Sequence, residues 1–516
     1  MAAETPSESD RELVLAAGGG GLKVVGSILR ALGGLGVSIL LTRLTGAAVF
    51  GQYYVCLTAA ELIAQVSGLG LQASTLRFIP ISIQQSDRPW LIGLVRAAVL
   101  IPLFLGLALA TLVFGFSDRL ATEFFSDPSM APALRIFAVA IPLSAFANAL
   151  EAALRGFNRV DLSILGMDFG FQLPKLLFVG AAVGIGYGAE GAATGHVAAL
   201  FIACLVLAYL LRTQMPRGET SPAVYRLREM WMQSLPVYMT RLLRTFGGRM
   251  ELLILGFFGL TLDVGIYAAA LQISMLGALL PESLITASMP LISGAHHREG
   301  PSAVQPLLRS TTRWCMSVVL PYYLVVALFS EELLAIFGEE FVGGEVSLLL
   351  LGALPLMNAM AGISASVLTM TGQARINAFN SLVYLVTTIG LDVILIPRYG
   401  MVGAASAAFS STLLLNLLRI AQVRWFFGLW PVDRHIIKPT VATASSLIVA
   451  LLLSPLLSGL HPWIAMGLSL VAMGLAYLAA LYKLGATDED RVVIDAIAAR
   501  VPALGRLIPD GPNGSN

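Results

Sequence analysis

The stretch RALGGLGVSILL, from Arg30 to Leu41, recurs in altered form as RTFGGRMELLIL, from Arg244 to Leu255. Each copy begins with an arginine, has Gly-Gly three residues later and continues as an apolar run. An arginine at the centre of a membrane helix costs at least about 2.5 kcal/mol on insertion scales, and glycine weakens a helix. Because both costs occur twice, 214 positions apart, the sequence predicts a duplicated helical unit.

The composition around this phrase is that of an integral membrane protein. Of 516 residues, 57% are hydrophobic and only 12% are charged, about half the charged fraction of an average soluble domain. The net charge of +1 gives no electrostatic basis for binding nucleic acid. The three cysteines are Cys56, Cys204 and Cys315, and they have neither disulfide nor metal-ligand spacing. We therefore expect no metal and no cofactor.

Apolar runs of membrane length recur along the chain. About 20 apolar residues cross the roughly 30 Å hydrocarbon layer as a helix. The runs predict about 14 transmembrane helices, near 16–42, 50–76, 91–117, 131–155, 162–185, 191–213, 231–259, 264–293, 313–330, 346–371, 376–396, 402–424, 436–458 and 463–484. Arginines concentrate in alternate loops, and the polar, acidic start does not fit the n-region of a signal peptide. We therefore expect both termini in the cytoplasm.

Further paired segments extend the repeat. YGAEGAATG from Tyr187 resembles YGMVGAASA from Tyr399, and AIPLSAFANAL from Ala140 resembles ALPLMNAMAGI from Ala353. Six helices per copy keep both copies in one orientation, so the predicted fold is an all-α polytopic membrane protein with two parallel six-helix repeats. Secondary transporters of this plan place their site at the repeat interface and work by alternating access.

The resulting domain organisation has six parts. It comprises a cytoplasmic N-terminus at 1–15, an N-lobe with helices one to six at 16–213, a cytoplasmic linker at 214–230, a C-lobe with helices seven to twelve at 231–425, a C-terminal helix pair at 436–484 and a cytoplasmic amphipathic tail at 485–516. The tail is expected either to lie on the inner leaflet surface or to be a solvated helix.

Charged and amide side chains inside the predicted helices indicate a cationic cavity. Arg30 and Arg244 lie about a dozen residues into their helices, near the bilayer centre. Guanidinium groups bind phosphate oxygens through two parallel hydrogen bonds, which favours an anionic substrate such as a lipid phosphate or diphosphate. The candidate substrate-binding residues are Arg30, Arg244, Lys175, Lys23, Arg241, Arg249 and Gln172. The alternative is structural, with the arginines snorkelling or held in static salt bridges.

Other intramembrane residues receive narrower predictions. Glu61 and Asp168 are candidate acids for coupling to a cation, and Glu151 with Arg155 is expected to form a structural pair. Asp392 and Arg419 receive no role. The four glycines of the repeated phrase are expected to permit close helix approach or a local break: Gly33, Gly34, Gly247 and Gly248.

Nothing in the sequence indicates an enzyme. The run of glycines at Gly18 to Gly21 lacks the lysine and hydroxyl of a phosphate-binding loop, and His296 and His297 lack further metal ligands. Catalytic acids of membrane glycosyltransferases usually lie on larger external loops than this chain has. We therefore expect no catalytic residues.

The segments LTRLTGAAVFGQYY, from Leu41, and GLGLQASTLRFIP, from Gly68, resemble polysaccharide-lipid flippases. That group, which includes O-antigen flippases, belongs to the multidrug/oligosaccharidyl-lipid/polysaccharide exporter superfamily. The resemblance implies an inner (plasma) membrane protein with a cationic central cavity, here Arg30, Lys175 and Arg244. It also implies undecaprenyl- or dolichyl-linked oligosaccharide as substrate. Pathway glycosyltransferases or a polymerase are the expected partners, and we expect a monomer.

These observations together predict a flippase. It would carry polyprenyl-phosphate or polyprenyl-diphosphate oligosaccharide from the inner to the outer leaflet by alternating access, for the synthesis of cell-surface glycans. One alternative is a cation-coupled multidrug exporter. Another is a non-transporting membrane subunit of a glycan-assembly complex.

Overall fold

The computed structural model describes residues 8–215 and 222–485, and all regular structure in this part of the chain is helical. Eleven of the described helices are long and apolar enough to cross a membrane. The prediction of an all-helical membrane fold is confirmed at this level. Residues 1–7, the middle of the predicted linker and the predicted amphipathic tail from residue 486 onward lie outside the described residues.

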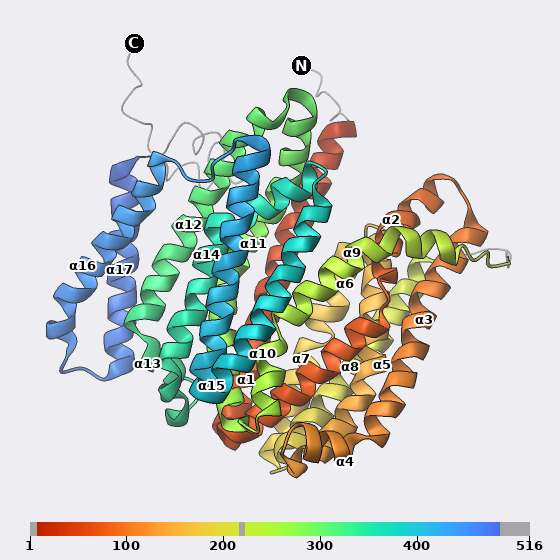
Figure 1. Cartoon of the computed structure of the whole chain (residues 1–516), viewed down its shortest axis with the longest axis horizontal. Helices are drawn as coiled ribbons and strands as arrows, with labels where there is room; N and C mark the ends of the chain where they lie inside the picture. Colours follow the sequence, from red (N-terminus) through yellow and green to blue (C-terminus); the bar gives the residue numbers. More distant parts are fainter. Residues whose placement is uncertain (1–7, 216–221, 486–516) are drawn as a thin grey trace, which may run out of the picture.

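The amino-terminal half of the molecule, hereafter the N-half, is drawn in red to yellow in Figure 1. Its helices are α1 (Glu8–Ser67), α2 (Leu71–Gln84), α3 (Arg88–Gly115), α4 (Ser117–Arg119), α5 (Ala131–Gly156), α6 (Val160–Ile164), α7 (Gln172–Gly184) and α8 (Gly188–Gln214). Short π-helical turns occupy η1 (Leu120–Phe124) and η3 (Leu165–Phe169), and a 3-10 turn occupies η2 (Pro128–Met130).

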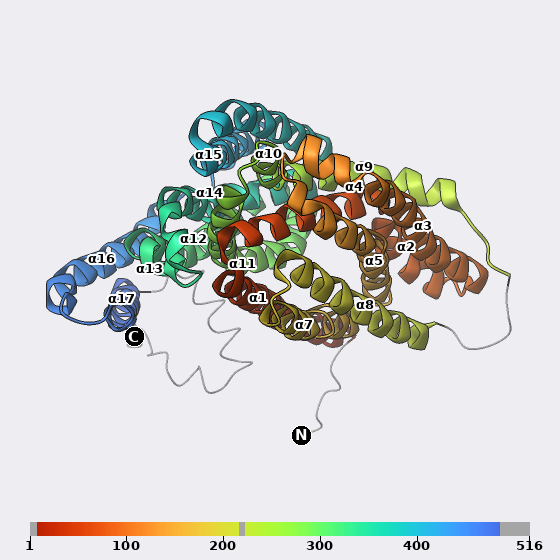
Figure 2. The same cartoon turned by 90° about the horizontal axis from the view of Figure 1, so that it is seen from below.

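The following helices form the C-half and a terminal pair, drawn in green to blue (Figure 1). The C-half has α9 (Leu227–Gly247), α10 (Met250–Phe257), α11 (Thr261–Glu299), α12 (Val304–Leu328), α13 (Ser330–Ala335), α14 (Glu345–Met370) and α15 (Ala374–Phe427), with 3-10 turns η4 (Pro301–Ala303) and η5 (Glu339–Gly344). The turn η6 (Arg434–Ile436) then leads into α16 (Ile437–Leu457) and α17 (Pro462–Leu484). This pair stands at one edge of the bundle, next to α12 and α13 (Figures 1 and 2).

Two of the continuous helices are each divided by a glycine. With 60 and 54 residues, α1 and α15 would be about 90 and 80 Å long if straight, far more than a bilayer needs. Gly46 (φ 82°) and Gly400 (φ 53°) adopt left-handed backbone at the kinks, which glycine tolerates at no steric cost. Each ribbon is therefore two helices joined at a sharp turn.

A carboxylate caps the helix that starts after each of these turns. The backbone N–H of Ala47 donates to Glu340 Oε1 at 2.7 Å, and that of Met401 donates to Asp263 Oδ2 at 3.1 Å. Anionic groups at a helix N-terminus bind its free N–H groups and complement its dipole. A Cβ at Gly46 would lie 2.8 Å from the Glu340 carboxylate, so the cap and the glycine require each other.

Left-handed residues occur at matching places in the two halves. Five such positions in the N-half are followed, 212 to 214 residues later, by a left-handed glycine in the C-half: Gly46 and Gly259, Ser86 and Gly300, Ser126 and Gly338, Asn158 and Gly372, and Gly188 and Gly400. This spacing equals that of the paired sequence segments. The turns between helices are therefore repeated at the same spacing as the paired sequence segments.

The two halves approach most closely where α1 crosses α11. A Cβ at Gly51 would lie 1.9 Å from the Thr261 carbonyl oxygen, and one at Gly265 would lie 2.0 Å from the Ala47 carbonyl oxygen. The contact is reciprocal, because each glycine touches the backbone four residues before the other glycine. Small residues permit this backbone-to-backbone packing between membrane helices.

The outer surface of the bundle is apolar, as a hydrocarbon environment requires. On α16, Leu456 is 76% exposed, and leucines on α17 are similarly uncovered. The described start of α1 and the end of α17 lie at the same end of the bundle (Figure 1). Because these two helix ends lie at the same end of the bundle, the chain between them is consistent with an even number of membrane crossings.

Candidate functional site

A polar cavity of about 160 Å³ lies between the two halves, at the end of the bundle where α2 meets α9 (Figure 1). Its walls come from the end of α1, from α2 and α5, and from α9 of the C-half. The lining residues are Gln65, Gly68, Gly70, Gln72, Ala73, Leu76, Asn148, Glu151, Ala152, Arg155, Val237, Tyr238 and Arg241. Three amides and one tyrosine accompany two arginines and one glutamate, so the wall is hydrogen-bonding and carries excess positive charge.

Contacts of α9 with α2 and with the end of α1 close this end of the cavity. The Tyr238 hydroxyl donates to the Val66 carbonyl oxygen at 3.0 Å, and the Ser74 hydroxyl donates to that of Met230 at 2.9 Å. A Cβ at Gly70 would lie 2.5 Å from Tyr238 Cβ, which explains a left-handed glycine at the break between α1 and α2. The C-half thus covers the cavity with its first helix.

Arg30 is paired with carboxylates in the N-half. Its Nε donates to Asp168 Oδ1 at 2.6 Å, and its Nη2 lies 3.9 Å from Glu151 Oε1. Asp168 is only 2% exposed and belongs to the π-helical turn η3. A Cβ at Gly26 would lie 2.6 Å from Asp168 Oδ2, so the small residue on α1 makes room for this carboxylate.

The expected pair of Glu151 and Arg155 is present. Glu151 Oε1 lies 2.5 Å from Arg155 Nη2, one helical turn later on α5. Because Glu151 also faces Arg30, the N-half has two arginines and two carboxylates in one group. Its charges therefore balance.

In the C-half, Arg241 and Arg244 are not paired with carboxylates among the described residues. Arg241 Nη1 donates to the neutral Gln72 side chain at 3.1 Å and lies within electrostatic range of Arg244, Arg155 and Glu151. In the described part of the chain, Arg244 has neither a hydrogen-bond nor an ion-pair partner for its side chain. Together with the N-half group, the four arginines and two carboxylates leave a formal charge of +2 around the cavity.

The position that corresponds to Asp168 in the C-half is neutral. Asn380, 212 residues after Asp168, exchanges hydrogen bonds of 2.6 and 2.8 Å with the Gln422 side chain. Arg419, which received no role from the sequence, is buried near Arg244, with only a 3.4 Å contact from its Nη1 to Asn416 Oδ1. Its Nε is buried without a partner. The C-half therefore concentrates guanidinium groups without carboxylates to neutralise them.

The first glycine of each repeated Gly-Gly lies against a neighbouring helix. A Cβ at Gly33 would lie 3.2 Å from Gln172 Cβ on α7, and one at Gly247 would lie 2.7 Å from Tyr384 Cε1 on α15. Gln172 and Tyr384 are themselves 212 positions apart. The two halves thus use the same glycine for the same close approach.

The second glycine of each pair differs in its effect on the helix. Gly34 has open space on its side-chain face, and Gly248 meets only the Arg244 carbonyl oxygen at 3.5 Å. The C-half helix ends at Gly247 and resumes as α10 at Met250, whereas α1 continues through its copy of the phrase. Only one of the two phrases is therefore broken.

The other predicted cations form a separate group. Arg249 makes an ion pair with Glu61, which joins the break between α9 and α10 to α1. Lys175 Nζ lies 5.5 Å above the Phe171 ring and within electrostatic range of Glu61. The side chain of Lys23 lies outside the described set. Of the predicted cations, Arg241 lines the cavity itself, and Arg30 and Arg244 interact with residues that line it.

A buried pair of carboxylates in the C-half was missed by the sequence reasoning. Glu251 on α10 is 3% exposed, and Asp392 on α15 is fully buried and close enough to interact with it electrostatically. Neither Asp392 oxygen has a hydrogen-bond partner among the described residues. The available signal was a single acid within an otherwise apolar helix, which marks a candidate functional residue in a membrane protein.

Comparisons with known proteins show the family of the chain. The sequence profile of the family described as polysaccharide biosynthesis protein matches residues 18–296, more than half of the chain. The probable flippase AglR of Haloferax volcanii is 26% identical over 270 residues, 52% of this chain and 56% of AglR. The probable low-salt glycan biosynthesis flippase Agl15 of the same organism is 25% identical over 159 residues, 31% of this chain and 34% of Agl15. The chain thus spans about half and one third of these relatives.

Solved structures share the fold at low sequence identity. The lipid II flippase MurJ in an inward closed conformation aligns with a TM-score of 0.71 and 14% identity, covering 88% of this chain and 97% of MurJ. An inward-facing multidrug resistance MATE transporter of the MOP superfamily aligns with a TM-score of 0.67 and 15% identity, covering 78% of this chain and 98% of that chain. The predicted family resemblance is confirmed: this chain is a multi-pass plasma-membrane protein that belongs to the polysaccharide biosynthesis protein family.

Proposed function

We propose that this protein is a flippase that moves a lipid-linked oligosaccharide, carried on polyprenyl phosphate or diphosphate, from the inner to the outer leaflet. The observation that carries the proposal is the unneutralised pair Arg241 and Arg244 at the cavity between the halves. A phosphate or diphosphate supplies the missing negative charge and suits the planar guanidinium donors. The name of AglR supports a flippase, and the names of Agl15, a glycan biosynthesis flippase, and MurJ, a lipid II flippase, support this class of cargo.

The remaining cavity wall suits a sugar. Gln65, Gln72 and Asn148 supply amide donors and acceptors, and Tyr238 supplies an aromatic face. Sugar hydroxyl groups are neutral and both donate and accept hydrogen bonds, as these side chains do. The polyprenyl tail would stay in hydrocarbon, against the apolar outer surface of the bundle.

A topology of fourteen helices, in two parallel six-helix repeats with a terminal pair, fits the fold. Its support is the recurrence of left-handed turns, the reciprocal contacts of Gly51 and Gly265, and the glycine kinks in α1 and α15. The two lobes would be residues 16–213 and 231–425, with both termini cytoplasmic. A reciprocal contact is what a pseudo-twofold axis produces.

Alternating access would then require two sets of contacts to break in turn. The contacts of α9 with α2 and the end of α1 close the end with the Arg-rich loops, and the α1–α11 contacts close the opposite end. At that opposite end, Arg43 Nε also donates to the Ile336 carbonyl oxygen at 2.9 Å. Rocking of the halves about the cavity would open one end while the other stays packed.

For energy coupling we propose the buried acids of the C-half. Glu61 and Asp168 are ion-paired with Arg249 and Arg30, so each would have to exchange an arginine for a cation. Asp392 has no hydrogen-bond partner among the described residues and is buried within electrostatic range of Glu251, where a proton or a metal cation would offset the cost of burying charge. Coupling through this pair would leave the cavity arginines free for substrate.

The test is flipping of a fluorescent lipid-diphosphate oligosaccharide in proteoliposomes. We expect the double substitution Arg241→Gln/Arg244→Gln to lower the rate at least about tenfold, since one hydrogen bond to a charged group contributes about 1.5 to 3 kcal/mol. Arg212→Gln, on an exposed arginine at the end of α8, is the matched control and should leave the rate unchanged.

Other results would favour the alternatives. Normal flipping by the folded double variant would make both arginines structural. Export of cationic dyes that depends on Glu251 or Asp392 and not on the arginines would favour a cation-coupled multidrug exporter. Absence of transport with every lipid carrier tried would favour a non-transporting membrane subunit.

A further inference from the structure

A second cavity, of about 450 Å³, lies at the start of α12, remote in sequence from the cavity between the halves. Its walls are the first turns of α12 and the segment that leads into α16. The lining residues are Gln305, Pro306, Arg309, Asp433, Arg434 and His435. None of them lines the cavity between the halves, so the two sites are independent.

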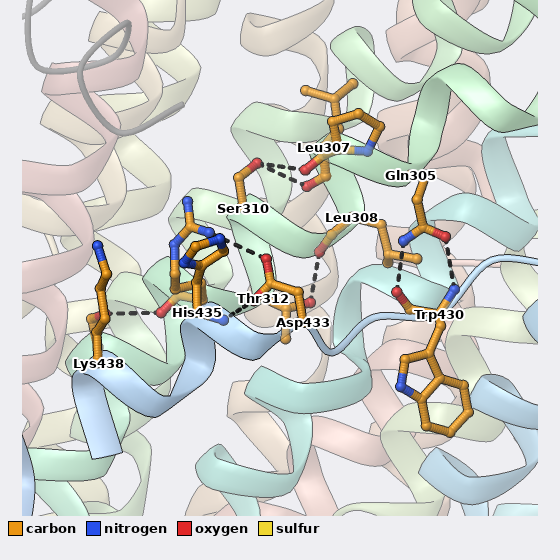
Figure 3. A network of polar contacts seen from close by, with 12 residues as sticks. Gln305, Leu307, Leu308, Ser310, Thr312, Trp430, Asp433, His435 and Lys438 are labelled. Carbon is orange, nitrogen blue, oxygen red and sulfur yellow. Dashed lines mark hydrogen bonds and ion pairs between the residues drawn. The ribbon is translucent and has the colours of Figure 1, made fainter. Parts of the chain in front are cut away.

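Side-chain hydrogen bonds join the segment before α16, which contains Trp430, to α12 (Figure 3). Gln305 Nε2 donates to the Trp430 carbonyl oxygen at 2.7 Å, and its Oε1 accepts from the Trp430 N–H at 3.0 Å. Asp433 Oδ1 accepts from the backbone N–H of His435 at 2.9 Å, which caps the turn η6. The cavity wall is therefore built by specific contacts.

The charge of this cavity is positive. Its only lining carboxylate, Asp433, is already engaged by the His435 N–H and by Arg313 Nη1 at 3.4 Å. Arg309 and Arg434 have no ion-pair partner in the described part of the chain. Arg309 Nε is also buried without any hydrogen-bond acceptor, which costs free energy unless a ligand supplies one.

The cavity lies at the ends of two candidate membrane spans, where lipid head groups are expected. Its residues belong to the first turns of two candidate membrane spans, Pro301–Leu328 and Arg434–Leu457, or directly precede the second. Trp425 at the end of α15 and Trp430 in the segment before α16 are 87% and 45% exposed, and tryptophan is enriched at the membrane–water interface. Beyond the cavity, Ile437 and Val441 of α16 expose apolar side chains that suit acyl chains.

We propose that this cavity binds the phosphate of an anionic phospholipid head group in the leaflet at this end of the bundle. Arg309 and Arg434 would hold the phosphate oxygens, and Trp430 would lie at the level of the glycerol. Basic pockets between membrane helices bind anionic head groups in this way. The bound lipid would anchor the segment before α16 to α12, and so the terminal helix pair to the C-half.

The test compares lipids in thermal unfolding of the purified full chain in detergent, with native mass spectrometry to count retained lipid. We expect phosphatidylglycerol to raise the Tm more than phosphatidylcholine at equal concentration. In Arg309→Gln/Arg434→Gln the apparent affinity for phosphatidylglycerol should fall about tenfold, which corresponds to the loss of one charge-assisted hydrogen bond. Arg375→Gln, on an exposed arginine at the start of α15, should behave as the wild type.

A single variant and a soluble anion separate lipid binding from loss of folding and from binding of free phosphate. The single variant Arg434→Gln changes only an exposed side chain and should weaken binding even if the double variant fails to fold. An equal gain in Tm from phosphatidylglycerol in wild type and in Arg434→Gln would overturn the assignment. Equal protection by inorganic phosphate alone would make the ligand a soluble anion and would overturn the lipid assignment.

Discussion

Arg30 and Arg244 begin the same phrase in the two halves, yet their electrostatic surroundings differ. Arg30 donates to the buried Asp168 at 2.6 Å, whereas the corresponding position in the C-half is Asn380, which bonds to Gln422. The acid of the C-half lies elsewhere: Asp392 is 12 residues beyond Asn380, about 18 Å along the helix. One half thus neutralises its arginine, while the other gives its arginine no acidic partner among the described residues.

The backbone contacts of the halves, in contrast, are nearly the same. Gly33 and Gly247 make the same close approach to the neighbouring helix, and Gly51 and Gly265 make a reciprocal one. The positions that set helix packing thus correspond in the two halves, whereas the charged positions differ. Packing in a bilayer depends on close backbone approach and tolerates little change, while a polar side chain that faces a cavity can change without moving a helix.

The largest effect is expected at the reciprocal backbone contact. Gly51→Val and Gly265→Val should each destabilise the fold by about 3 kcal/mol or more, because a side chain there would overlap a carbonyl group of the other half. Folded yield and Tm in detergent measure this effect. Gly34→Ala, which faces open space, is the control. A clear difference between the two valine variants would contradict the reciprocity.

The next largest effect is a difference between Arg30 and Arg244 in how much their substitution lowers the free energy of unfolding. Arg30→Gln leaves Asp168 buried without its ion-pair partner and should cost about 1 to 3 kcal/mol. Arg244→Gln, on an exposed side chain without a partner, should stay within about 0.5 kcal/mol. Adding Asp168→Asn to Arg30→Gln should recover part of the loss in a double-mutant cycle. Equal destabilisation by both single variants would show that the halves do not differ here.

A smaller effect is expected when the C-half is given the acid of the N-half. Asn380→Asp should place a carboxylate near Arg244 and lower the flipping rate about tenfold, with a loss of transition-state stabilisation near 1.4 kcal/mol. Gln422 Nε2 still donates to the new side chain, but Gln422 Oε1 loses its donor at the buried position of Asn380, so the Tm should also fall and rates are compared per folded protein. Asn158→Asp, the same change at an exposed residue in the turn after α5, is the matched control. A normal rate for Asn380→Asp would mean that free charge at Arg244 is not required.

The smallest effect concerns the displaced acids of the C-half. If Glu251 and Asp392 bind a coupling cation, that cation should stabilise the wild type by about 0.4 kcal/mol when its concentration equals the Kd. The shift should be absent in Asp392→Asn and present in Asp161→Asn, an exposed acid on α6. Titration of sodium and potassium at constant ionic strength, followed by Tm, measures it. Persistence of the shift in Asp392→Asn would place cation binding elsewhere.

Much of the fold was predictable because membrane insertion depends on local composition. A segment of about 20 apolar residues must form a helix in hydrocarbon, where unpaired backbone groups are too costly. The Glu151–Arg155 pair was predictable for a related reason, since residues four apart on a helix are neighbours. The repeated phrase likewise pointed to Gly33 and Gly247 as contact positions and to Arg244 as a candidate site residue.

By itself, then, the sequence determined the membrane class, the approximate helices and the charged residues that a cavity could use. Only the tertiary structure decided which charges meet: Arg30 with Asp168, 138 positions away, Arg249 with Glu61, and Asp392 with Glu251. Helix formation depends on each segment and its solvent, whereas an ion pair depends on which helices approach and at what height. That choice is made by close backbone contacts at a few glycines and by turns distant in sequence, so no single segment contains it.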